Sequence, residues 1–168
     1  MTLPSTPVTA LESLSAKVGG FCGYQSCKDR KPSDQHLRNY LVTRIDTILA
    51  GLASLPPAPE EEQRLLAEAV HSTRRKLATI SASLQDPTYE GQDFFIREQI
   101  ADKRLSRIYD HEQEMLEKLD GIQAEVISLQ KTQLGKEMIE DHFLHIADFI
   151  DTMNQALFER ESLILGNQ

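Results

Sequence analysis

The feature of this chain that most constrains its fold is the spacing of its apolar residues, which recur three and four positions apart along four stretches. Such spacing places apolar side chains on one face of an α-helix, and other helices must cover that face. The four sets are Leu37, Leu41, Ile45, Ile48, Leu52 and Leu55; Leu66, Val70, Leu77, Ile80 and Leu84; Ala101, Leu105, Ile108, Met115, Leu119, Ile122, Val126 and Leu129; and Ile139, Phe143, Ile146, Ile150, Met153 and Leu157. The sequence therefore predicts an all-α protein in which four long, coiled-coil-like helices share one core.

The bounds of the first two helices follow from their flanking residues. Ser33 is a favourable N-cap for a helix that runs to about residue 54, and the prolines within 55–59 end it. The second helix begins with the glutamates at 60–62, because carboxylates are stabilising at a helix N-terminus. It is predicted to end before Pro87.

The third helix is predicted over 94–134 and the fourth over 136–165, with Gly135 as the boundary where the apolar register resets. An alternative is one unbroken helix over 94–164, with the register shift accommodated as a stutter. A helix over 94–134 would be about 60 Å long, so the fourth helix or a second copy of the chain would have to cover its excess apolar side. Because short connections favour antiparallel neighbours, the predicted fold is an antiparallel up-down four-helix bundle.

A short helix is expected near the N-terminus, over residues 6–18. Thr6 is a possible cap, and Thr9 with Glu12 has the spacing of a capping box. The segment that follows has no apolar period and is predicted to be a loop. The chain is thus expected to divide into an N-terminal part, 1–32, and a helical bundle, 33–168.

Composition and charge exclude several classes of protein. A chain of 168 residues fits one domain, and its net charge of −8 argues against general binding to nucleic acid. No uncharged stretch is long enough to span a bilayer, and the N-terminus lacks the pattern of a signal peptide. Only two cysteines are present, too few for a disulfide scaffold. We therefore expect a cytoplasmic protein without a membrane span.

Two histidines on the predicted fourth helix are candidate metal ligands. His142 and His145 lie one turn apart, and glutamates of the third helix, Glu98 and Glu112, occupy positions on its apolar side. These groups could supply nitrogen and oxygen ligands to a transition metal, or the histidines to a haem. The alternative is structural, with the histidines bonding to solvent or a carboxylate and the glutamates setting helix register. A dinuclear iron centre is not predicted, because Glu-x-x-His spacing occurs only once, at residues 68–71.

The two cysteines, Cys22 and Cys27, are a second candidate site. Three cations follow closely in the sequence, and they would favour the thiolate form: Lys28, Arg30 and Lys31. Three interpretations stay open: unrelated free thiols, a redox-sensitive pair, and a metal site completed by a histidine such as His36.

Charges are unevenly distributed along the predicted third helix. Its first part is basic and its later part is acidic. In an antiparallel hairpin, Arg74 and Arg75 near the end of the second helix would lie beside this basic start. The bundle would then have a positive pole, which steers a partner or a second copy, unless the charges serve only solubility.

No motif for nucleophilic catalysis or phosphate binding is present, so an enzyme is not predicted. We expect an adaptor, regulator or chaperone-like factor that binds a protein partner through helical surfaces, forms a homodimer and needs no cofactor. The residues expected at the partner surface are Glu98, Arg104, Arg107, Glu112, Arg74 and Arg75. The alternatives are a metal- or haem-binding bundle that uses Cys22, Cys27, His142 or His145, and a thiol redox sensor that uses the two cysteines.

Overall fold

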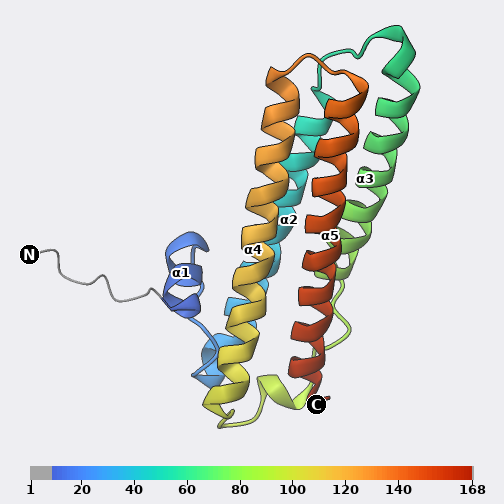
Figure 1. Cartoon of the computed structure of the whole chain (residues 1–168). Helices are drawn as coiled ribbons and strands as arrows, with labels where there is room; N and C mark the ends of the chain where they lie inside the picture. Colours follow the sequence, from blue (N-terminus) through green and yellow to red (C-terminus); the bar gives the residue numbers. More distant parts are fainter. Residues whose placement is uncertain (1–8, 168) are drawn as a thin grey trace, which may run out of the picture.

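A computed structural model describes residues 9–167, and all regular structure within them is helical. Four long helices lie side by side, and a short one packs against them near the N-terminus (Figure 1). The elements are α1 (Ala10–Lys17), α2 (Cys27–Ala53), the 3-10 turn η1 (Glu60–Glu62), α3 (Gln63–Gln85), the 3-10 turn η2 (Asp93–Phe95), α4 (Asp102–Lys131) and α5 (Lys136–Leu165). The predicted all-α helical bundle is confirmed.

The four long helices form a ring in which α2 contacts α3 and α4, and α5 contacts α3 and α4. Side-chain bonds give the relative direction of α4 and α5. Arg104, near the start of α4, donates to the carbonyl oxygen of Leu163 at the end of α5, whereas Glu125, late in α4, contacts His142 near the start of α5. These two helices are therefore antiparallel.

The neighbours α2 and α4 run in the same direction. Arg44 of α2 donates to Asp120, and further along both helices Gln130 donates to the carbonyl oxygen of Gly51. The connection between α3 and α4, residues 86–101, must therefore cross one end of the bundle, as Figure 1 shows.

This crossing connection closes the lower end of the core in Figure 1. It buries Tyr89, Phe94 and Phe95, and η2 contacts both α2 and α5. The prediction that the third helix begins at residue 94 was wrong, because these apolar residues cover the end of the core instead of extending a helix. α4 and α5 are both 30 residues long, so the apolar side of α4 needs no second copy to cover it.

The first long helix also begins elsewhere than predicted. α2 starts at Cys27, with Pro32 inside its second turn, where a proline removes one backbone bond of the early helix. Ser33 is not a cap. Its buried hydroxyl accepts a bond of 3.0 Å from the backbone N–H of Cys22. The predicted division between residues 32 and 33 falls within this continuous helix.

Other predicted boundaries agree with the structure. Thr9 and Glu12 form the capping box of α1, while the predicted start at 6–8 lies outside the described residues. α4 ends at Lys131 and α5 begins after Gly135, which is its N-cap. The alternative of a single helix over 94–164 was wrong.

The predicted apolar sets form the core. Their buried members include Leu37, Leu41, Ile45, Ile48, Leu52, Leu77, Ile80, Leu84, Leu105, Ile108, Met115, Leu119, Ile122, Val126, Leu129, Ile139, Phe143, Ile146, Ile150, Met153 and Leu157. A Cβ added to Gly121 of α4 would lie 2.9 Å from the Phe149 ring of α5. In the described part of the chain, no helix has the length and apolar character needed to cross a bilayer.

Candidate functional site

A cluster of charged and phenolic side chains is buried inside the bundle, and Arg160 of α5 is at its centre. The Arg160 guanidinium donates to Glu112 of α4 at 2.7 Å and to Asp34 of α2 at 2.5 Å. It also donates to the phenolic oxygens of Tyr89 at 2.8 Å and Tyr24 at 3.2 Å. One side chain therefore joins α5 to two helices, to the crossing connection and to the loop before α2. We call these five residues and Arg38 the buried cluster.

Asp34 is held in its charged form. Its carboxylate accepts bonds from Arg160, from Arg38 at 2.8 Å and from Tyr89 at 2.8 Å. Burial alone raises the pKa of this carboxyl, but the Arg160 charge and these bonds outweigh it and lower the pKa below its ordinary value. Asp34 thus supplies a permanent negative charge at neutral pH.

Glu112 has a different environment. Burial raises its pKa to about 7, against the opposing effect of Arg160. Oε1 accepts from Tyr24 at 2.5 Å and from Arg160, while Oε2 is buried without a hydrogen-bond partner among residues 9–167. A carboxyl with one unbonded buried oxygen binds a proton more readily than an ordinary glutamate. Of the two carboxyl groups in the cluster, Glu112 is therefore the one whose pKa is raised toward neutral pH.

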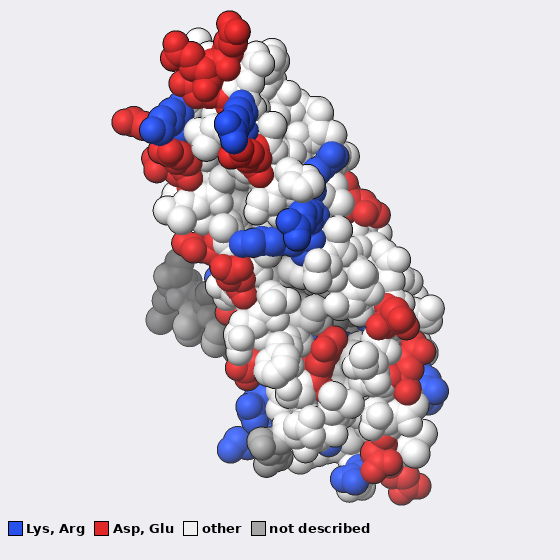
Figure 2. Space-filling model, turned by 90° about the vertical axis from the view of Figure 1, so that its right-hand side faces the viewer, with Lys and Arg blue, Asp and Glu red and all other residues white. Residues whose placement is uncertain are grey.

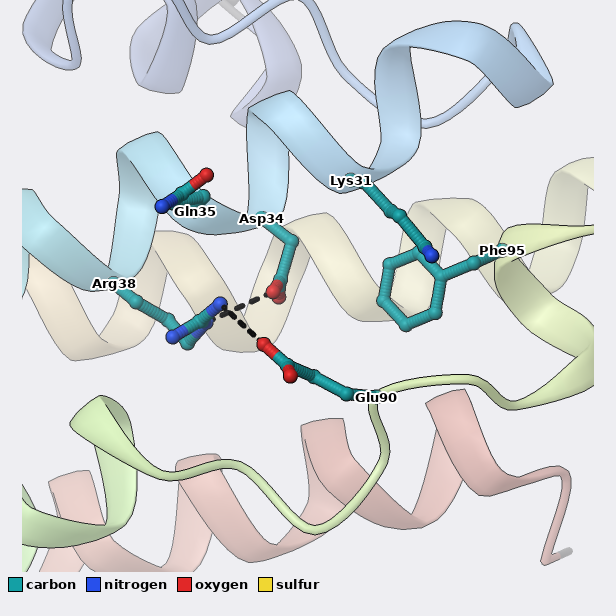
Figure 3. Close-up of a pocket in the computed structure, with 6 residues that line it drawn as sticks. All are labelled: Lys31, Asp34, Gln35, Arg38, Glu90 and Phe95. Carbon is teal, nitrogen blue, oxygen red and sulfur yellow. Dashed lines mark hydrogen bonds and ion pairs between the residues drawn. The ribbon is translucent and has the colours of Figure 1, made fainter.

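A pocket of about 260 Å³ leads from solvent to this cluster (Figure 3). Asp34 and Arg38 lie on its inner side, and the remaining lining residues are Lys31, Gln35, Glu90 and Phe95. Arg38 is fixed by Asp34 and by a bond of 2.9 Å to the carbonyl oxygen of Leu84. It also pairs at 3.4 Å with Glu90, whose side chain is 70% exposed.

Arg30 adds a buried positive charge at the same end of the bundle. Its guanidinium donates to the backbone oxygens of Tyr24 at 2.7 Å and Phe94 at 3.0 Å, and to that of Arg97. It makes no ion pair with any carboxylate in the described chain, and it lies over the Phe94 ring. Carbonyl oxygens solvate this cation without neutralising it.

The outer face of α5 combines exposed apolar residues with acidic ones. Leu144 and Phe158 are 60% and 65% exposed. Asp151 lies midway between them, and Leu165 comes seven residues after Phe158, so the four residues share one side of the helix. The acidic residues of this helix are Glu137, Glu140, Asp141, Asp148, Asp151, Glu159 and Glu161. Its cations are Lys136 at its start and the buried Arg160. Figure 2 shows a group of basic side chains near the middle of one face, and acidic and basic side chains next to each other at its two ends.

The structure removes Glu112 from the predicted partner surface and leaves the exposed residues of that surface as a prediction. Glu112 is fully buried, so it is not available to a partner, and Glu98 precedes α4 rather than lying on it. Arg104 donates to the backbone oxygens of Leu163 and Ile164 and thereby caps α5. Arg107, Arg74 and Arg75 are exposed.

The predicted basic pole is not assembled. Arg74 and Arg75 lie on α3, which packs against α2 and α5, whereas Arg104 and Arg107 lie on α4. The crossing connection places α3 and α4 at diagonal corners of the ring.

The structure brings two of the predicted metal ligands together and separates them from the other two. His142 and His145 both contact Glu125, the latter at 3.3 Å. The thiols of Cys22 and Cys27 are free, and the thiol of Cys27 donates to the backbone oxygen of Phe95 near the opposite end of α5. Between residues 9 and 167, no three His, Cys, Asp or Glu side chains are arranged to hold a metal ion. The metal and redox hypotheses stay predictions.

Sequence reasoning identified Glu112 as a polar residue on an apolar helix side but missed the other members of the buried cluster. Arg160 follows Met153 and Leu157 at helical spacing, and that position was the available signal. Asp34 and Arg38 likewise flank Leu37 on the buried side of α2. Comparison with family models, with curated proteins and with solved structures gave no match.

Proposed function

We propose that this protein is a helical interaction protein, an adaptor or regulator, whose outer α5 face binds a basic amphipathic segment of a partner protein. The observation that supports the proposal is the exposure of Leu144 and Phe158 on a helix whose exposed charged residues are mostly acidic. Exposed apolar side chains bordered by charge are typical of interaction sites. A partner helix would cover them with its own apolar residues and pair its Lys and Arg with the flanking carboxylates.

The charge of this face favours a different protein over a second copy. In a two-fold dimer through α5, the same acidic surfaces would face each other and repel. The buried cluster supports the proposed role, because Arg160 ties α5 to α2 and α4 and keeps the outer face in one orientation. The free thiols of Cys22 and Cys27 fit the proposed cytoplasmic location.

The test uses a synthetic peptide with Leu at seven-residue spacing and Lys at the flanking helical positions, and a scrambled peptide of the same composition. We expect fluorescence anisotropy to show binding of the patterned peptide that weakens as salt rises. Replacing Leu144 and Phe158 together by Ser removes two apolar contacts and should weaken binding by about tenfold or more. Ile96→Ser is the matched control, since Ile96 is 66% exposed but lies outside α5.

Equal affinity for the scrambled peptide, or equal loss in the Ile96→Ser control, would contradict the proposal. Light scattering of the unmodified protein tests the alternative occupant. A dimer that the double Ser variant dissociates would assign the outer face of α5 to a second copy instead.

A further inference from the structure

Without the exposed carboxylate of Glu90, the residues that line the pocket beside the buried cluster carry a net positive charge. Lys31 and Arg38 are the cations that line it, and its inner carboxylate, Asp34, is bonded to Arg38 and to Arg160. Glu90, on the solvent side, supplies the second negative charge among the lining residues. With Glu90 set aside, the two cations face one buried carboxylate, and one further anion would balance them.

The position of that anion is currently taken by Glu90. Among residues 9–167, the polar partner of its carboxylate is Arg38 at 3.4 Å, and its side chain is largely in solvent. An exposed pair of this length contributes little to stability. Glu90 belongs to the crossing connection, so its side chain can leave Arg38 without disturbing a helix.

Two donors face this position from opposite sides. Arg38 is held in place by Asp34 and Leu84, and its Nη2 group points toward Glu90 (Figure 3). Lys31 points toward Phe95 on the other side of the pocket in Figure 3 and makes no ion pair with a described carboxylate. A planar guanidinium together with an ammonium group is well suited to bind a carboxylate.

The remaining lining sets the size and character of the ligand. The volume of about 260 Å³ lies just below the ~300–1,000 Å³ of typical ligand pockets. The Phe95 ring, which stacks on Tyr89 with a centroid distance of 6.0 Å, provides a rigid apolar surface. We infer that this pocket binds a small organic carboxylate with an apolar body, and that the ligand displaces Glu90 from Arg38. This inference does not depend on the proposed role of α5.

The experiment measures the binding of benzoate by isothermal titration, with neutral benzamide and cationic benzylamine as comparison probes. Benzoate should bind and the other two should not, because only benzoate supplies the missing negative charge. Lys31→Gln should weaken benzoate binding by about tenfold through loss of a charged hydrogen bond. Lys28→Gln is the matched control, since Lys28 is exposed on the same helix, carries the same charge and does not line the pocket.

Glu90→Gln gives the most specific test. A displaced carboxylate competes with the ligand, so removing its charge should tighten benzoate binding several-fold. Lys28, Lys31 and Glu90 are exposed, and circular dichroism should find each variant folded. The inference is overturned if benzamide binds as well as benzoate, if Lys28→Gln weakens binding as much as Lys31→Gln, or if Glu90→Gln leaves the affinity unchanged.

Discussion

Arg160 and Glu112 show how single residues set the properties of this bundle. Arg160 pairs with two buried carboxylates, Asp34 and Glu112, and Asp34 also pairs with Arg38. Such pairs are costly to bury, yet removing one member leaves the other charged in a medium that solvates it poorly. The buried cluster therefore fixes the positions of α2, α4 and α5 relative to one another and adds little net free energy of folding.

Replacing Arg160 by Met should therefore be severe. The change keeps much of the side-chain volume but leaves Asp34 without its central cation, and we expect a loss of about 3–5 kcal/mol in the free energy of unfolding. Urea denaturation measures this loss. Arg107→Met, on the exposed surface of α4, is the control and should change stability by less than about 0.5 kcal/mol. Equal effects would mean that the cluster does not hold the helices together.

Glu112 predicts an unusual dependence of stability on pH. Its pKa rises from 4.5 in the unfolded chain to about 7 in the fold, so the folded state binds the proton more tightly. Stability contributed by the protonated form is complete below pH 4.5 and is lost as the pH rises through 7, by about 3 kcal/mol in total. Asp34 acts in the opposite sense and at lower pH, because its pKa is lowered and its stabilisation is lost on acidification.

Urea titrations at several pH values test this prediction. The free energy of unfolding should fall between pH 5 and pH 8 in the unmodified protein, whereas Glu112→Gln should remove most of this slope. An unchanged slope in the variant would show that Glu112 is not the titrating group.

At the scale of elements, close packing of α4 on α5 explains a glycine that the apolar pattern left unexplained. Gly121 lies within α4, where glycine costs up to about 1 kcal/mol relative to alanine. The Phe149 ring occupies the space that a Cβ would need. Glycine at position 121 lowers the helix propensity of α4 but leaves room for the Phe149 ring of α5.

Gly121→Val should destabilise the protein by about 1–3 kcal/mol through overpacking against Phe149. Ala124→Val is the matched control, because Ala124 is exposed on the same helix and the change costs only helix propensity. Thermal unfolding followed by circular dichroism compares the two. If both variants lose the same amount, the contact with Phe149 does not determine the effect.

At the scale of the whole molecule, the crossing connection determines which helices are neighbours. Because residues 86–101 pass over the end of the core, α2 lies beside α4, and α3 lies beside α5. This arrangement brings Tyr89 to Asp34 and Arg160, and it creates the pocket at Glu90. It also leaves the outer face of α5 uncovered within the described chain.

Leu119→Asp tests whether the apolar side of α4 packs against helices of the same molecule or against a second copy of the chain. Leu119 is fully buried between helices of one molecule, so a charge there should unfold the protein or destabilise it by more than about 4 kcal/mol. Circular dichroism and light scattering together measure the outcome. A variant that stays folded and only dissociates would show that this side packs against a second copy.

The periodicity of the apolar residues was sufficient to predict helices, most of their bounds and the members of the core. Helical spacing depends on residues three and four apart, and the capping box of Thr9 and the break at Gly135 are equally local. Phe94, Phe95 and Ile100 lie within the predicted third helix yet precede α4, because they belong to the connection that covers the end of the core. The local sequence around these residues does not indicate that they cover the end of the core.

The site depends on distances between segments far apart in the chain. Arg160 lies 126 residues from Asp34 and 136 from Tyr24, and their bonds exist only because the ring of helices closes around them. The raised pKa of Glu112 has the same origin, since burial is a property of the packed bundle. The spacing of apolar residues determines which face of each helix must be buried. Which helix covers that face is decided by the free energy of packing and by the path of the connection over residues 86–101.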